Sequence, residues 1–165
     1  MENEESSIHS SFFILHSSFF INSVVNFFST AQEQSIIAAI KEAERQTSGE
    51  IRVHLERELI GDALTVAARV FHELEMDTTE ERNGVLIFIV PSMHRFAIIG
   101  DSGINEKVPP NFWDDIRDVM QDNFRQGKFT AGVIEGVRRA GTKLKEFFPR
   151  KTNDKNELPD EISYG

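Results

Sequence analysis

The chain of 165 residues predicts a small, single α/β domain in which a mixed β-sheet is sandwiched by about four helices. Three observations predict this class. Apolar residues recur at helical spacing in four segments, an unbroken β-branched run marks a central strand, and helix-like and strand-like segments alternate along the chain. Such alternation is typical of layered α/β folds, and the length is that of one domain.

The first half of the domain is expected to be helix, strand, helix. Thr30 and Glu33 have the spacing of a capping box, which predicts a helix start, and Ser48-Gly49 predicts its end. Residues 50–56 alternate between apolar and polar side chains, as in a half-buried strand. Asp62 is expected at the N-terminus of a second helix, where negative charge is favourable.

The second half is expected to be a hairpin followed by two helices. Residues 85–90 are uninterruptedly apolar, which predicts a central strand, and residues 95–100 return as its hairpin partner. The strand–helix–strand unit of residues 50–90 is predicted to be a right-handed parallel crossover. Two helical stripes follow, formed by Trp113, Ile116, Met120 and Phe124, and by Phe129, Val133, Val137, Ala140, Leu144 and Phe147.

The two ends differ from the middle in composition. Residues 1–26 contain a near-exact repeat of seven residues and acids where a signal peptide has Lys or Arg, so we expect a low-complexity leader outside the fold. The alternative is a segment that binds a partner or a membrane surface. Residues 149–165 are polar and are expected to be a disordered tail, which leaves residues 27–148 as the domain. No apolar run is long enough for a transmembrane segment.

Composition excludes several classes of function. The formal net charge of −9, from 27 acids and 18 bases, argues against nucleic-acid binding. The absence of cysteine excludes disulfides, thiolate metal sites and cysteine nucleophiles. The sequence has neither a phosphate-binding glycine loop nor the Asp-x-Asp-x-Thr of aspartyl-phosphate enzymes, so a phosphatase would have to use metal-activated water held by carboxylates.

Five short motifs occur in order along the predicted domain: Ser48 to Val53, Asp62 with Ala67-Ala68 and Phe71, Arg82 to Ile87, Gly100 to Ile104, and Phe124 to Phe129 leading into Gly132. The ordered set resembles the TPM domain family. The resemblance implies a mixed sheet between helices with an acidic site at one edge. Some members bind calcium or another divalent cation, some are acid phosphatases, and others are interaction modules on membrane complexes. Many carry a signal peptide and a membrane anchor, which this sequence lacks, so a stand-alone cytoplasmic version is expected.

Asp101 and Asn83 are the leading candidates for cation ligands. Asp101 follows a strand and precedes Ser102-Gly103, a loop able to expose carbonyl oxygens, and calcium prefers oxygen ligands. Asn83 enters the strand whose hairpin partner ends at Asp101, so its oxygen is expected nearby. For each residue the alternative is a structural role, as a turn-capping Asp or as part of an Asn-Gly turn.

Three further acids complete the candidate metal ligands. Glu81 lies in the same loop as Asn83 and could supply a second carboxylate. Glu50, at the start of a strand, could join the site or pair with Arg52 or Arg82. Asp114 shares a helical face with Asp118, and a cation or plain solvent would relieve their repulsion.

These observations favour a non-catalytic domain that binds a divalent cation, with calcium expected, and acts as a regulatory or interaction module with an unnamed protein partner. The first alternative is a metal-dependent acid phosphatase that uses the same carboxylates. The second is a protein-interaction module that needs no metal.

Overall fold

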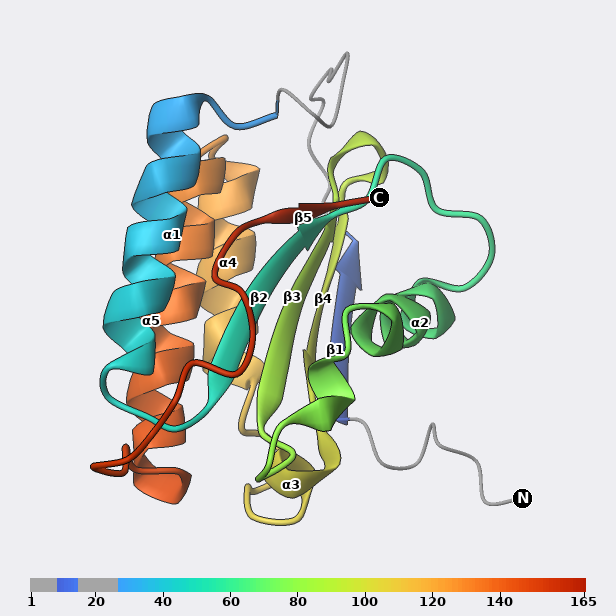
Figure 1. The fold of residues 1–165 in the computed structure, drawn as a ribbon. Coiled ribbons are helices and arrows are strands. Elements are labelled where there is room, and N and C mark those ends of the chain that lie inside the picture. The colour runs from blue at the N-terminus through green and yellow to red at the C-terminus, as the bar shows by residue number, and fades with distance from the viewer. Residues whose placement is uncertain (1–8, 15–26) are drawn as a thin grey trace.

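The computed structural model describes residues 9–14 as a strand and residues 27–165 throughout. Five strands form one mixed sheet in the order β1-β4-β3-β2-β5 (Figure 1). They are β1 (His9–Ile14), β2 (Glu50–Leu55), β3 (Gly84–Val90), β4 (Arg95–Gly100) and β5 (Ser163–Tyr164). The helices are α1 (Thr30–Glu44), α2 (Ala63–Glu73), α3 (Ser102–Asn105), α4 (Asp114–Arg125) and α5 (Phe129–Phe147), with short 3-10 turns η3 (Met76–Thr78) and η4 (Pro91–Met93).

The pairing of the strands confirms the predicted mixed sheet. β2 and β3 are parallel and are joined through α2, whereas β3 and β4 form an antiparallel hairpin. Every residue of β3 is buried, because neighbouring strands flank it and helices cover both faces of the sheet. β1 extends the sheet beyond β4, and β5 extends it beyond β2.

Helices cover both faces of the sheet, as predicted. Figure 1 shows α1, α4 and α5 against one face and α2 against the other. The residues of β3 alternate between two apolar cores, whereas the apolar residues of β2 all face one of them. Ile51, Val53 and Leu55 face the three-helix layer, and Leu86 and Phe88 face α2.

The helix starts are set by capping residues. Ser29, rather than Thr30, caps α1, and its partner in the capping box is Gln32, one residue earlier than the predicted pair. Asp62 caps α2 by accepting a hydrogen bond from the Thr65 amide at 3.0 Å, as predicted. The short helix α3 after Asp101 was not predicted, because four residues are too few to show helical periodicity.

Both predictions for the ends of the chain need correction. Residues 149–165, predicted as a disordered tail, pack along the sheet, where Leu158 and Ile162 are buried and β5 pairs with β2. Within the predicted leader, residues 9–14 pair with β4 as β1, so this part does not lie outside the fold. Residues 1–8 and 15–26 lie outside the described residues. The polar composition of residues 149–165 is typical of a disordered segment. It cannot reveal the contacts that order them, since their partners lie far away in the sequence.

No helix in the described parts of the chain is both long enough and apolar enough to cross a membrane.

Leu158→Ala tests whether the C-terminal segment belongs to the cooperative fold. Leu158 is 6% exposed in the core beside α2, so its truncation is expected to lower the free energy of unfolding by about 2–4 kcal/mol. Urea denaturation measures this, with Thr152→Ala at an exposed position of the same segment as the control. Equal stability of the two variants would show that the segment contributes nothing to the fold.

Candidate functional site

One edge of the sheet gathers most of the predicted site residues. Because β2 and β3 are parallel, their first residues lie side by side, with Glu50 opposite Gly84. The hairpin then brings the end of β4 to the same edge, where the amide of Asp101 donates to the carbonyl of Gly84 at 3.0 Å. The loops that enter β2 and β3 therefore meet beside the loop that leaves β4.

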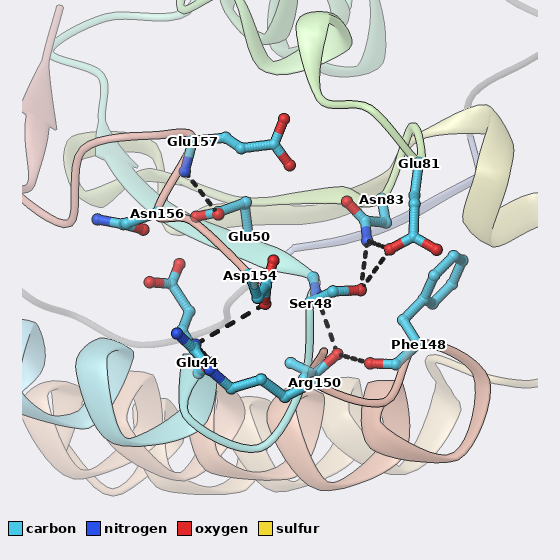
Figure 2. A network of polar contacts seen from close by, with 12 residues as sticks. Glu44, Ser48, Glu50, Glu81, Asn83, Phe148, Arg150, Asp154, Asn156 and Glu157 are labelled. Carbon is cyan, nitrogen blue, oxygen red and sulfur yellow. Dashed lines mark hydrogen bonds and ion pairs between the residues drawn. The ribbon is translucent and has the colours of Figure 1, made fainter. Parts of the chain in front are cut away.

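Ser48, Glu81 and Asn83 form a compact polar group at this edge (Figure 2). The Ser48 hydroxyl donates to Glu81 Oε2 at 2.6 Å. Asn83 Nδ2 donates to Ser48 Oγ at 3.2 Å and to Glu81 Oε2 at 3.5 Å. Asn83 is fully buried, and among the described residues its Oδ1 has no hydrogen-bond partner. A buried carbonyl oxygen without a partner is uncommon and calls for an explanation, such as a bound water or ion.

Glu81 is the charged member of the group. Burial acts to raise the pKa of Glu81, but hydrogen bonds from Ser48 and Lys151 and the positive charges of Lys151 and Lys107 outweigh burial and lower it. Its side chain is 26% exposed. Glu81 is therefore an ionised carboxylate that solvent ions can reach.

The loop that carries Glu81 and Asn83 is held by close backbone packing. A Cβ at Gly103 would collide with the carbonyl oxygens of Glu81 and Arg82, so only glycine permits this approach of α3. Arg82 takes a positive φ of 51°, and the Asn83 amide donates to Thr79 Oγ1 at 3.1 Å. These constraints turn the Asn83 side chain toward Ser48.

Asp101 lies at the same edge but is engaged by a different partner. Its carboxylate receives Arg82 Nε at 2.9 Å and Nη2 at 3.1 Å, and it caps α3 by accepting from the Ser102 amide at 2.7 Å. The structural alternative considered for Asp101, a turn cap, is thus realised. Its role as a cation ligand stays a prediction and would require release of Arg82.

Glu50 belongs to a second group of acids with Glu44 and Asp160. Glu50 Oε1 accepts from the Glu157 amide at 2.8 Å rather than from Arg52 or Arg82, and its buried Oε2 has no partner among the described residues. Glu44 Oε1 accepts from the Ile51 amide at 2.9 Å. Burial, a hydrogen bond with Asp160 and the charge of Glu50 raise the pKa of Glu44 to about 10. Burial also raises the pKa of Glu50 to about 7, although the Glu157 amide opposes it.

Asp114 is paired with an arginine of its own helix. It lies on the surface of α4 with its side chain 51% exposed and pairs with Arg117 at 3.2 Å. Asp118 pairs with the same Arg117 at 2.9 Å. A guanidinium therefore relieves the repulsion between the two carboxylates.

Sequence analysis missed Ser48 and the C-terminal segment as parts of the site. Ser48 stands in the same motif as Glu50 but was interpreted only as a helix end. Within the described residues, no three acids or histidines are placed to hold a metal ion by themselves. A cation here would therefore need neutral oxygens such as Ser48 Oγ and Asn83 Oδ1.

The buried acids predict an unusual pH dependence of stability. A carboxyl group whose pKa is raised by folding binds its proton more tightly in the folded state. Its contribution is complete below the unfolded pKa of 4.5 and is lost as the pH rises toward the folded value, about 10 for Glu44. Glu44 alone should therefore lower the free energy of unfolding between pH 7 and 9 by up to about 1.4 kcal/mol per pH unit. His54, whose pKa burial lowers from 6.5, is already neutral in this range.

Urea denaturation between pH 7 and 9 measures this slope. Glu44→Gln keeps the shape of the side chain but does not titrate, so it should flatten the slope. Glu42→Gln, at an exposed position of the same helix, is the control and should leave the slope unchanged. A slope that persists in Glu44→Gln would show that Glu44 is not the titrating group.

Comparison with known proteins shows which family the chain resembles. The family model of the TPM domain matches residues 21–143. Among curated proteins, no sequence matches the chain. Two solved structures show the fold alone. One is the N-terminal domain of a protein from P. gingivalis, with 21% identity and a TM-score of 0.59; the match covers 74% of this chain and 80% of that one. The other is the N-terminal domain of cg2496 from Corynebacterium glutamicum, with 13% identity and a TM-score of 0.58; the match covers 91% of this chain and 93% of that one.

A third structure is much more similar. The NMR structure of the BA42 protein from the psychrophilic bacterium Bizionia argentinensis is 43% identical, with a TM-score of 0.83. The match covers 88% of this chain and 100% of BA42. The family model spans well over half of the chain. The chain therefore belongs to the TPM domain family.

Proposed function

We propose that this TPM domain is a non-catalytic module that binds a divalent cation, calcium in the first instance, at Ser48, Glu81 and Asn83. The single observation that carries the proposal is the Asn83 amide: its fully buried Oδ1 has no hydrogen-bond partner among the described residues, while its Nδ2 lies beside the carboxylate of Glu81. Binding would serve regulation of the domain rather than turnover.

The donor set fits a hard cation. Glu81 would supply a carboxylate, Asn83 an amide oxygen and Ser48 a hydroxyl oxygen, with water completing the six to eight ligands that calcium takes. The set contains no sulfur or imidazole, the ligands that favour zinc and copper. A polar cavity of about 310 Å³ adjoins Glu81, so hydrated ions can reach it.

The Asn83 amide is compatible with either state of the site. In the structure Nδ2, not Oδ1, faces Ser48 and Glu81 (Figure 2). A half-turn of the amide exchanges the two atoms without changing the outline of the side chain. The amide can therefore donate to Glu81 when no cation is present and offer its oxygen when one is.

The charge state of Glu81 favours a role as a cation ligand over a role as a general base. A general base works best when its pKa lies near the working pH. The hydrogen bonds and positive charges around Glu81 lower its pKa, which makes it a weak base but a good anionic ligand. A metal-dependent phosphatase would use the carboxylate as a ligand in the same way, so an assay of phosphate release is needed to distinguish the two functions.

Thermal unfolding of the full chain with calcium, magnesium or a chelator tests the proposal. A ligand that binds only the native state raises Tm, by about 2–4 °C per kcal/mol of binding free energy for a chain of this size. We expect calcium to raise the Tm of the wild type and to lose most of this effect in Glu81→Gln.

Asp114→Asn is the matched control, because it removes one carboxylate from the surface of α4. It should keep the calcium effect. Loss of the effect in Asp114→Asn alone would move the site to α4, and no shift in any protein at millimolar calcium would refute cation binding. Hydrolysis of an aryl phosphate, assayed in the same buffers, tests the phosphatase: turnover that disappears in Glu81→Gln would overturn the non-catalytic assignment.

A further inference from the structure

The C-terminal segment places a positive charge directly on the proposed cation ligand. Lys151 Nζ lies 3.2 Å from Glu81 Oε1. Glu81 Oε2 already accepts from Ser48 and Asn83. Both oxygens of the carboxylate are therefore partnered, and the ammonium group of Lys151 supplies the charge that a bound cation would supply.

Lys151 is presented by a segment that is anchored on both sides of it. On one side the carbonyl of Phe148 accepts from the Ser48 amide at 3.0 Å. On the other side Glu157 donates its amide to Glu50 Oε1 at 2.8 Å and accepts from the Glu80 amide at 3.0 Å. Figure 2 shows the contact of Glu157 with Glu50 beside the polar group of the site. The long side chain of Lys151 is more than half exposed, so it can leave Glu81 without breaking these anchors.

The cavity beside Glu81 lies between this stretch and the loop. Glu80 and Glu81 line it from the loop, and Lys151, Asp154, Lys155 and Glu157 line it from the segment. A cation that enters this cavity to reach Glu81 therefore meets the ammonium group of Lys151 there. The two lysines differ in their contacts, since Lys151 pairs with Glu81 whereas Lys155 forms no ion pair with a described residue.

We propose that Lys151 is a tethered competitor for the cation site: its ammonium group occupies Glu81 in the metal-free protein, and a divalent cation must displace it. The inference rests on the proposed function and adds its regulation. By linkage, a bound cation weakens the contact between the segment and the loop by the same factor by which that contact weakens cation binding.

The magnitude of the competition follows from exposure. The Lys151 side chain is 54% exposed, and pairs of this kind are weak and screened by salt. Lys151 can therefore be displaced at modest cation concentrations. Its removal should tighten calcium binding by about 2–5-fold, the factor that corresponds to the usual strength of an exposed ion pair.

Isothermal titration of the full chain with calcium chloride tests the competition. Lys151→Met should lower the Kd by about 2–5-fold. The matched control is Lys155→Met, which removes the same charge from the same cavity and should change the Kd clearly less. Equal tightening in the two variants would show a general charge effect and overturn the specific role of Lys151.

A second measurement follows Lys151 itself in the wild type. Acetylation by a water-soluble active ester, quantified by mass spectrometry, reports how free each lysine is. Calcium should raise the rate at Lys151 with a midpoint at the measured Kd and leave Lys155 unchanged. Calcium binding with no change at Lys151 and an unaltered Kd in Lys151→Met would refute the inference while the proposed function stands. No binding in any of the proteins would remove both.

Discussion

The burial of the polar side of β2 is the constraint on which the rest of the structure depends. Glu50, Arg52 and His54 are 3%, 8% and 4% exposed, although they alternate with the apolar residues of a central strand. Buried polar and charged groups are costly unless they find partners. The C-terminal segment supplies them: the Glu157 amide for Glu50, the charges of Asp160 and Glu161 for Arg52, and Ser163 Oγ, 2.8 Å away, for His54 Nδ1.

This segment also connects the polar strand to the candidate site. It leaves α5 beside Ser48, passes Glu81 and Glu50 at one edge of the sheet, and ends as β5 beside the far end of β2. Figure 1 shows it running along the sheet between these two points. A change in the contacts of Glu81 therefore acts on a segment whose other contacts stabilise the sheet.

Much of the fold could be predicted because its signals are local. The unbroken run of β3, the alternation of β2 and the stripes of α4 and α5 each follow from spacing alone. The course of the C-terminal segment could not be predicted, because its polar residues bind partners about a hundred positions away in the sequence. The hydrogen bond from the Glu157 amide to Glu50 is an example. Alternation correctly separated the two sides of β2, but it could not show that the polar side is covered.

The candidate site was predictable in its loop but not in its partners. Asn83 and Glu81 stand out because the loop enters a recognisable strand. Ser48 and Lys151 come from two other parts of the chain, and only the parallel pairing of β2 with β3 and the path after α5 bring them together. For Asp101 and Asp114 the decisive neighbours are arginines, Arg82 and Arg117, whose reach cannot be inferred from spacing.

The contacts of Glu81 explain why a cation here would modulate the domain rather than build it. Structural metal sites hold charges that remain uncompensated when the metal leaves, so that the fold is lost with the metal. Ser48, Asn83 and Lys151 already satisfy the carboxylate of Glu81, and within this group Asn83 Oδ1 is the atom left without a partner among the described residues. A cation would therefore exchange one set of satisfied contacts for another. The net free energy of such an exchange is small, so its direction depends on the concentrations of the ion and of salt.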